Sequence, residues 1–208
     1  MIPVSAAILA GGKASRLNGI NKSEIRVGTK RIIDIQISLL KDIFDEILLV
    51  SSSEAVFKEL KTISDYYVDV GPIAGIHSAL THASNPSVFV FSSDMPFLNS
   101  LLIRTMLTKY LNSTADIMVP LNNHFIEPLH AIYSKSCLPV IEQSIHQKRY
   151  AIRAFFDHLN VFYWDLPETF KSDEVFFNIN YPEDILKANL YANRMEQQSK
   201  GNIKKLPT

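Results

Sequence analysis

Apolar runs alternate along the chain with longer stretches in which apolar residues recur at helical spacing. Residues Val4–Ala10, Glu46–Val50 and Ser87–Ser92 are almost continuously apolar, as is typical of strands buried on both faces of a sheet. Shorter runs predict further strands over Tyr66–Val70, Asp116–Leu121, Leu129–Ser134 and Val161–Leu166.

The stretches between these runs carry the spacing of amphipathic helices. Pro182 stands directly before the last of them, where proline is favoured in the first turn. We expect helices over Lys30–Ile43, Ser53–Ile63, Ile73–Ala83, Asn99–Leu111, Ser136–His146, Ala151–Leu159 and Glu183–Met195. Repeated strand–helix–strand units predict an α/β fold, a single three-layer Rossmann-like domain with a mostly parallel mixed sheet. Ligands of such folds bind at the carboxyl ends of the strands.

Composition removes several classes of protein from consideration. The 208 residues include 47% hydrophobic and 20% charged side chains, which fits a globular domain. Basic and acidic residues both number 21, so the chain lacks the basic surplus of a general nucleic-acid binder. No apolar run approaches the roughly 20 residues of a membrane span, and the N-terminus lacks a basic signal-peptide start. The single Cys137 forms no internal disulfide, so we expect a cytoplasmic protein without a nucleic-acid or membrane partner.

The first strand runs directly into Gly11-Gly12, and three cations follow: Lys13, Arg16 and Lys22. The segment is neither G-x-G-x-x-G nor the P-loop pattern, which counts against a dinucleotide oxidoreductase and a P-loop NTPase. Glycine lets backbone N–H groups approach phosphates, and Arg and Lys bind phosphate oxygens. We interpret the segment as a loop for the phosphates of a nucleotide; a solvated basic loop is the alternative.

Two aspartates follow predicted strands. Asp94 lies two residues after the apolar run Ser87–Ser92. Its carboxylate suits Mg²⁺, which takes few carboxylate ligands and keeps several waters. An N-cap or turn aspartate before Pro96 is the alternative. Asp69 precedes the only other glycine-rich turn of the chain body, Gly71-Pro72-Ile73-Ala74-Gly75, and a plain turn residue is an equally good interpretation.

The second half of the chain offers fewer distinctive residues. Asn178 and Asn180 alternate with apolar residues before the last helix, where Asn180 could simply cap the helix. His130 is either a ligand contact or a polar strand residue. The remaining histidines show no zinc-like spacing with cysteine, which argues against a histidine metal site.

Taken in order, these segments resemble the molybdenum cofactor guanylyltransferases, a family within the Rossmann-like nucleotidyltransferases. The family's L-A-G-G, G-P-L-A-G and D-x-P stand here as Leu9-Ala10-Gly11-Gly12, Gly71-Pro72-Ile73-Ala74-Gly75 and Asp94-Met95-Pro96. Two later motifs match Glu127-Pro128-Leu129-His130-Ala131 and Asn178-Ile179-Asn180-Tyr181-Pro182-Glu183-Asp184. The chain departs from the pattern at Leu17, Asn18, Asn21 and Tyr181.

The resemblance implies an enzyme that transfers GMP from GTP to the terminal phosphate of molybdenum-loaded molybdopterin and releases pyrophosphate, with Mg²⁺ as cofactor. It implies a nucleotide-binding half at 1–100, a pterin-binding half at 101–196 and a flexible tail at 197–208. Molybdoenzyme apoproteins or their chaperones are implied as partners.

By the same resemblance, each candidate residue receives a role. Lys22, Asp94 and Arg16 are the catalytic candidates, and Asp94 also holds the metal. The residues implied to bind GTP are Leu9, Ala10, Gly11, Gly12, Lys22, Asp69 and Asp94. Those implied on the pterin side are His130, Asn178 and Asn180.

Two alternatives remain open on sequence alone. The chain could be a related nucleotidyltransferase, namely a molybdopterin cytidylyltransferase or a sugar-phosphate nucleotidyltransferase. It could instead be a non-catalytic nucleotide-binding carrier or partner of a molybdoenzyme. Lys22 and Asp94 together favour an enzyme, because a binding protein has no need of a metal carboxylate.

Overall fold

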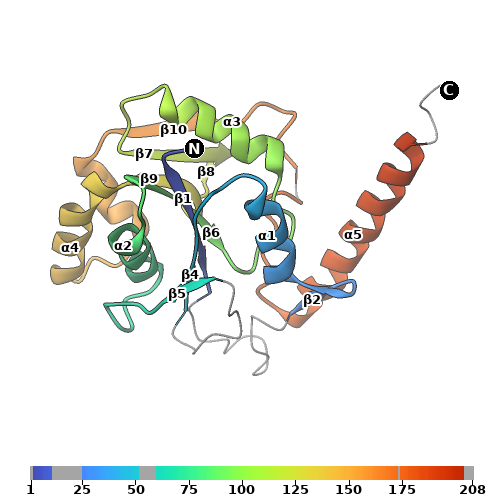
Figure 1. The fold of residues 1–208 in the computed structure, drawn as a ribbon, viewed down its shortest axis with the longest axis horizontal. Helices are drawn as coiled ribbons and strands as arrows, with labels where there is room; N and C mark the ends of the chain where they lie inside the picture. The colour runs from blue at the N-terminus through green and yellow to red at the C-terminus, as the bar shows by residue number, and fades with distance from the viewer. Residues whose placement is uncertain (1, 11–24, 52–59, 173, 204–208) are drawn as a thin grey trace.

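The computed structural model describes residues 2–10, 25–51, 60–172 and 174–203. Within them, eight strands form one mixed sheet in the order β10-β7-β9-β6-β1-β4-β5, and β8 pairs with the end of β7 (Figure 1). The strands are β1 Val4–Leu9, β4 Ile47–Val50, β5 Lys61–Ile63, β6 Ser87–Ser92, β7 Ile117–Asn122, β8 Phe125–Ile126, β9 His130–Ser134 and β10 Val161–Asp165.

Parallel pairing dominates the centre of this sheet. β1 lies between β4 and β6, parallel to both, and β5 and β10 extend the sheet with further parallel pairs. Two strands are antiparallel to their neighbours: β9 between β6 and β7, and β8 beside the end of β7. β1, β4 and β6 are buried along their whole length, which explains their nearly continuous apolar sequences.

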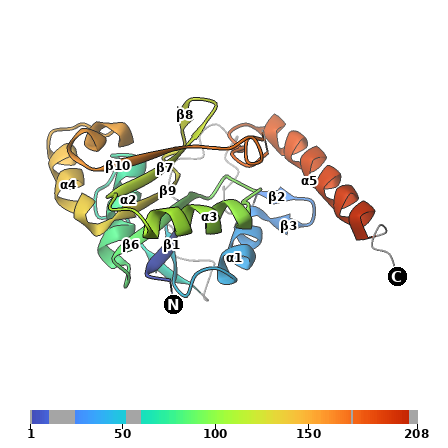
Figure 2. The same cartoon turned by 90° about the horizontal axis from the view of Figure 1, so that it is seen from above.

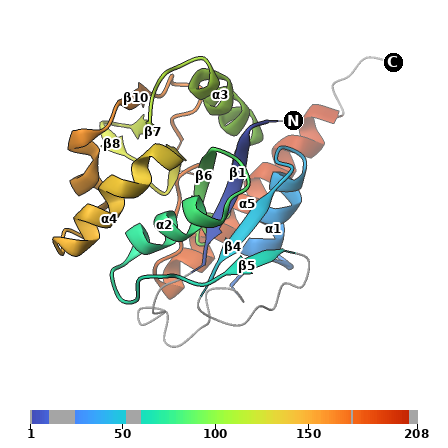
Figure 3. The same ribbon diagram turned by 60° about the vertical axis from the view of Figure 1, so that its left-hand side comes forward.

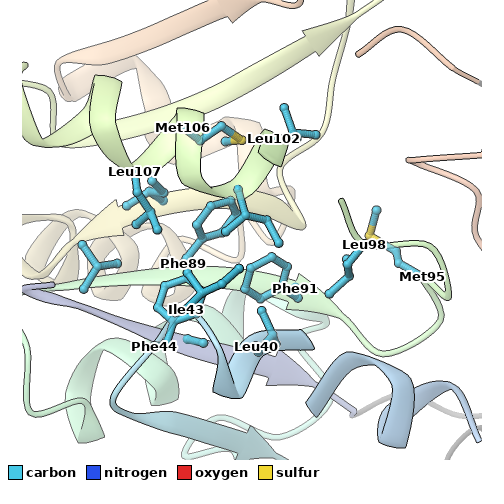
Figure 4. Close-up of a cluster of buried hydrophobic side chains, with 14 of the residues drawn as sticks. Leu40, Ile43, Phe44, Phe89, Phe91, Met95, Leu98, Leu102, Met106 and Leu107 are labelled. Carbon is cyan, nitrogen blue, oxygen red and sulfur yellow. The ribbon is translucent and has the colours of Figure 1, made fainter. Parts of the chain in front are cut away.

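Helices cover both faces of the sheet (Figures 1 and 3). One apolar cluster lies on the side of α1 and α3, where Phe44 packs edge-on against the stacked rings of Phe89 and Phe91 (Figure 4). The second cluster lies on the side of α2 and α4 and includes buried Cys137 and Tyr133. The helices are α1 Ile32–Lys41, α2 Pro72–His82, α3 Ser100–Leu111, α4 Leu138–His146 and α5 Pro182–Ile203, with 3₁₀ turns η2 Lys135–Cys137 and η3 Ile152–His158.

A small hairpin, β2 Arg26–Val27 with β3 Lys30–Arg31, links the first helix to the last. Gly28 has φ +62° in the hairpin turn, a conformation that favours glycine, and its N–H donates to Asn189 Oδ1 of α5 at 2.7 Å. Ile25, Val27 and Ile32 share a third apolar cluster with α5. From this contact, α5 extends away from the domain (Figures 1 and 2).

The predicted fold class is confirmed: a three-layer α/β domain with a mostly parallel mixed sheet. Two predicted elements are wrong. Lys61–Ile63, expected at the end of a helix over Ser53–Ile63, forms strand β5 and pairs with β4; residues 52–59 lie outside the described residues. The strand expected over Tyr66–Val70 is a series of bends, because β5 already takes the edge position and Tyr66 and Val68 are three-quarters exposed.

Several element bounds also differ from expectation. The helix expected over Ala151–Leu159 is the 3₁₀ turn η3, and the last helix continues to Ile203 instead of ending at Met195. Within the described residues, none of the helices has both the length and the hydropathy that a membrane span requires.

Candidate active site

The carboxyl ends of β1, β4 and β6 meet at one edge of the sheet. Leu9 is in register with Val50 of β4 and Ser92 of β6. Beyond the strand, Ala10 N–H donates to the carbonyl of Val50 at 2.8 Å, and Ser93 N–H donates to the carbonyl of Leu9 at 3.1 Å. Leu9 and Ala10, predicted to bind nucleotide, are therefore adjacent to the turn that carries Asp94.

Asp94 is the most firmly held of the predicted site residues. Its side chain is 8% exposed, and Ser92 Oγ donates to Asp94 Oδ1 at 2.6 Å. The carbonyl of Asp94 accepts from Ile179 N–H at 3.0 Å. The hydroxyl of Ser92 thus holds the carboxylate of Asp94, and Ile179 N–H holds its backbone, at the carboxyl end of β6.

Gln36 of α1 binds the backbone of this turn. The residue is fully buried, and Gln36 Nε2 donates to the carbonyls of Ser92 at 2.8 Å and Met95 at 2.9 Å. One amide group therefore binds the backbone on both sides of Asp94. Sequence reasoning missed this residue, because a glutamine on an apolar helix face carries no motif.

The turn Gly71-Pro72-Ile73-Ala74-Gly75 has a steric explanation at each glycine. Gly71 precedes α2 with φ +79°, where a side chain would strain the backbone. A Cβ at Gly75 would lie 3.2 Å from Leu9 Cδ1, tighter than ordinary packing allows. Gly75 therefore lets the first turn of α2 approach the end of β1.

Asp69, predicted to bind the nucleoside, is exposed and adopts φ +58° in the bends before Gly71. Its assignment stays a prediction. Asp65 is a second candidate at the same edge. It follows β5 by two residues, burial raises the pKa of its carboxyl group, and its Oδ1 is buried without a hydrogen-bond partner among the described residues. A buried carboxylate oxygen without a partner among the described residues marks Asp65 as a candidate ligand-binding residue, and the sequence alone does not show this burial.

His130 occupies the strand beside β6 but is fully buried. Its ring lies edge-on to Phe89, Phe91 and Phe176 at centroid distances of 5.3–5.4 Å. Neither ring nitrogen has a partner among the described residues, and burial lowers the pKa of the imidazole to about 3. His130 is thus neutral at physiological pH, and a ligand would reach it only if the chain around Phe176 moved.

The segment that carries Asn178 and Asn180 lies across this part of the site. Phe176 contacts the His130 ring, and Ile179 N–H binds the carbonyl of Asp94, so the two asparagines flank a direct link to the turn of Asp94. Asn178 Nδ2 donates to the carbonyl of Phe176 at 3.1 Å. Asn180 is exposed.

The start of α5 is capped by a residue other than the expected one. Asp184 accepts the backbone N–H groups of Asn180 at 2.9 Å and of Tyr181 at 2.8 Å. The carboxylate therefore satisfies donors that a helix N-terminus would leave free, and it also fixes the end of the Asn178–Asn180 segment.

Four predicted site residues, Gly11, Gly12, Arg16 and Lys22, lie outside the described residues. The segment to which they belong begins directly after Ala10 and ends before Ile25. Ala10, the last described residue before this segment, is adjacent to the turn of Asp94 through Leu9; the roles of the four residues stay predictions.

Asp94 fits a magnesium ion that is shared with a nucleotide. Mg²⁺ in nucleotide sites is bound by one or two carboxylates and completes its octahedron with phosphate oxygens and water. Among the described residues, no group of three His, Cys, Asp or Glu side chains is arranged to hold a metal ion. Among the described residues, Asp94 would therefore supply a single anchoring carboxylate rather than a complete metal cage.

A hollow of about 380 Å³ lies elsewhere, along α1 and α3, lined among others by Asp34, Ser38 and Arg104. None of the predicted site residues lines it. The site is consequently defined by the strand ends and not by this hollow.

Comparisons with known proteins agree with this arrangement. The sequence model of the family described as "MobA-like NTP transferase domain" matches residues 6–161. A relative from Natranaerobius thermophilus, named a probable molybdenum cofactor guanylyltransferase, is 35% identical over 93% of this chain and 98% of its own length. A relative of the same name from Pelotomaculum thermopropionicum is 31% identical over 92% of this chain and 95% of its own length.

Solved structures give the same result. Molybdopterin-guanine dinucleotide biosynthesis protein A from Archaeoglobus fulgidus superposes with a TM-score of 0.80 and 29% identity, covering 91% of this chain and 99% of that one. The 2-C-methyl-D-erythritol 4-phosphate cytidylyltransferase from Thermus thermophilus, at 14% identity and a TM-score of 0.68, shares the fold.

The mixed sheet, the strand end at Leu9-Ala10 and the aspartate after the neighbouring strand together define a nucleotidyltransferase. Within that class, the chain belongs to the MobA-like NTP transferase domain family. Its matches to the molybdenum cofactor guanylyltransferases extend over nearly the full length of both chains.

Proposed function

We propose that the protein transfers GMP from GTP to the terminal phosphate of molybdenum-loaded molybdopterin. The observation that carries the proposal is the buried carboxylate of Asp94, fixed at the ligand edge by Ser92, Gln36 and Ile179. It occurs in a chain that matches proteins named molybdenum cofactor guanylyltransferases over nearly its whole length.

The reaction requires no general base. A phosphate oxygen of molybdopterin, already an anion near neutral pH, forms a bond to the α-phosphorus of GTP. The bond from the α-phosphorus to the bridging oxygen breaks, and pyrophosphate leaves with the electron pair. The enzyme accelerates this displacement by positioning the two anions and stabilising the charge that develops between them.

The nucleotide half has the parts for this task. Leu9 and Ala10 bring the backbone to the nucleotide, and Gly11-Gly12 would let N–H groups approach its phosphates. Lys22 and Arg16 would neutralise the triphosphate. Asp69 would contact the nucleoside; the buried carboxyl oxygen of Asp65 supports it as a second candidate for that contact.

Asp94 would hold Mg²⁺ together with the triphosphate. When bound, Mg²⁺ supplies a Lewis acid that neutralises phosphate charge in the transition state. The short hydrogen bond from Ser92 Oγ orients the carboxylate, and the buried amide of Gln36 keeps the turn in place.

The acceptor would bind on the side of Asn178 and Asn180. Both asparagines belong to the segment that is joined to Asp94 through Ile179 N–H, so an acceptor held there would be close to the nucleotide. His130 would support this segment through its ring contact with Phe176.

The test is the release of pyrophosphate from each of the four ribonucleoside triphosphates, with and without molybdenum-loaded molybdopterin, in the presence of Mg²⁺. We expect release from GTP that depends on the acceptor. Equal or greater release with CTP would replace the guanylyl assignment by a cytidylyl one. Nucleotide binding without release would favour the carrier alternative.

A further inference from the structure

Glu127 is a half-buried glutamate near the carboxyl end of β7, at the edge of the sheet where Asp94 lies. Its N–H donates to the carbonyl of Pro120 at 3.1 Å, and its carbonyl accepts from His130 N–H at 3.0 Å. Ser92 N–H donates to the carbonyl of Leu129 at 3.1 Å, which joins this turn to the strand that leads to Asp94. Glu127 therefore lies in the part of the site that borders β6.

The strand registers place its side chain on one particular face. Glu127 continues β8 by one residue, directly opposite Pro120, and Pro120 is in register with Trp164 of β10. Residues directly opposite on neighbouring strands share a face, so Glu127 lies on the face of Trp164. Trp164 belongs to the cluster on the α1 and α3 side. His130, in contact with Phe91, lies on that face as well.

Asn122 is on this face too. It pairs with Phe125, whose side chain is 75% exposed, and it is the diagonal neighbour of Glu127 across the β7–β8 pair. The Oδ1 atom of Asn122 is buried and has no hydrogen-bond partner among the described residues. Figure 2 shows the β8 hairpin at the edge of the molecule opposite the N-terminus.

The side chain of Glu127 lacks a compensating group. Within the part of the chain that the structure describes, it forms no ion pair or hydrogen bond, and burial alone raises the pKa of its carboxyl group to about 7. A desolvated acceptor of this kind is costly unless a donor binds it. Glu127 and Asn122 Oδ1 thus place two hydrogen-bond acceptors on one face, neither with a donor among the described residues, which suits a ligand that presents N–H groups.

We propose that Glu127 determines specificity for the acceptor by accepting hydrogen bonds from the 2-amino group and the adjacent ring N–H of its pterin, with Asn122 Oδ1 as a further acceptor. The inference rests on the proposed function, since it takes a pterin phosphate as the second substrate. These two N–H groups of a pterin are parallel donors, and one carboxylate can accept both. Glu127 is thereby a binding residue, and the phosphate end of the acceptor extends toward Asp94.

The first experiment compares two small probes on the whole protein, 6-hydroxymethylpterin and its 2-oxo analogue 6-hydroxymethyllumazine. The lumazine keeps the ring N–H but has a carbonyl where the pterin has its amino group, so one of the two hydrogen bonds to Glu127 is replaced by a repulsion between oxygens. We expect wild type to bind the pterin at least about tenfold more tightly and Glu127→Gln to lose this preference. Equal binding of both probes by wild type would overturn the proposal.

The second experiment is kinetic. In Glu127→Gln we expect the KM for molybdopterin to rise about tenfold while the KM for GTP stays unchanged. Glu168→Gln is the matched control, because its side chain is 88% exposed on the chain that follows β10. An unchanged KM for molybdopterin in Glu127→Gln would also overturn the proposal.

Failure of the proposed function has a different outcome. If wild type releases no pyrophosphate from GTP with molybdopterin, the guanylyl assignment fails. The preference of wild type for pterin over lumazine would still test whether Glu127 binds a pterin. Glutamine has nearly the shape of glutamate and removes a desolvated charge, so the variant should fold. If it does not, the preference of wild type between the two probes decides the proposal by itself.

Discussion

At the scale of single residues, the site depends on side chains whose surroundings fix their chemistry. Asp94 is almost fully buried, and its Oδ1 accepts a 2.6 Å hydrogen bond from Ser92. His130 is a neutral ring among phenylalanines, and Glu127 is a carboxyl group without a donor. In the proposed function, Asp94 and Glu127 would face a ligand, whereas His130 would support the chain that covers it.

Replacement of Asp94 should affect turnover and leave the fold intact. In Asp94→Asn the hydrogen bond with Ser92 can be retained, but the charge that anchors the metal and nucleotide is lost. We expect kcat to fall about a hundredfold or more, which corresponds to roughly 3 kcal/mol of transition-state stabilisation. Thermal unfolding should remain close to that of wild type. A folded variant with near-normal kcat at saturating Mg²⁺ would contradict the assignment.

His130 should make the protein sensitive to acid. Because the folded state holds its pKa at about 3, the unfolded state binds a proton below about pH 6.5 that the folded state does not. The contribution of His130 to stability is therefore fully present above that pH and is lost as the pH falls toward 3, by up to about 1.4 kcal/mol per pH unit. Urea titrations between pH 7.5 and 4.5 should show a smaller loss in His130→Phe. The exposed His158, changed to Gln, should leave the slope of wild type unchanged.

At the scale of secondary-structure elements, α1 and the turn after β6 act together. Gln36 binds the backbone on both sides of Asp94, so helix α1 helps to position Asp94 in the turn after β6. The remaining Oε1 of Gln36 is buried without a partner among the described residues, which is a cost that an apolar residue would avoid.

Gln36→Met tests this coupling. The carbonyl of Met95 would lose its Gln36 donor, and the carbonyl of Ser92 would keep the 3.4 Å hydrogen bond from Met95 N–H, so we expect the free energy of unfolding to fall by about 1–3 kcal/mol. The kcat should also fall, because the turn of Asp94 loses its support. Gln143→Met on the exposed side of α4 is the control for the same chemical change. If Gln36→Met keeps the stability and the kcat of wild type, α1 has no part in positioning Asp94.

The elements that could be predicted from sequence are those with strong patterns. β1, β4 and β6 are buried on both faces, and their apolar runs revealed them. β5 was missed because it is a three-residue edge strand, and its identity as a strand depends on pairing with β4. β8 was missed because its turn uses Asn123 and His124, both at positive φ, in place of the Asn-Gly that signals a two-residue hairpin.

The same distinction holds for the site. The positions of Asp94 and Leu9-Ala10 at the ends of the strands could be predicted, because Asp94 follows a recognisable strand and Leu9-Ala10 precede two glycines; their roles stay predictions. Gln36, Asp65 and Glu127 could not, since their relevance follows from burial and from missing partners, which depend on residues far away in the sequence.

At the scale of the whole molecule, one sheet brings the residues predicted for both substrates to one edge, and α5 packs on the side of the β2–β3 hairpin. Tyr191 of α5 packs edge-on against Phe97 and Phe177 at 6.0 and 5.4 Å. Beyond it, Ala192 is half-buried, and the other described side chains, Asn193 to Met195 and Gln197, are exposed. The stabilising contacts of α5 are therefore in its first half.

Deletion of residues 197–208 should change the free energy of unfolding by less than about 0.5 kcal/mol and leave activity intact, because the sequence of this segment is mostly polar and has no apolar periodicity that would dock it on the domain. Tyr191→Ala in the full chain is the positive control and should cost about 3 kcal/mol. Loss of soluble protein on truncation would show that the end of α5 packs on another surface.

The central claim is transfer of a guanylyl group, and isotopic labelling tests it most directly. The protein would be incubated with Mg²⁺, molybdenum-loaded molybdopterin and GTP labelled with ³²P at either the α- or the γ-phosphate. The account predicts that the α-label enters the pterin product as a guanine dinucleotide and that the γ-label is released as pyrophosphate. Transfer of the γ-label to the pterin, or no transfer of either label by folded protein, would contradict it.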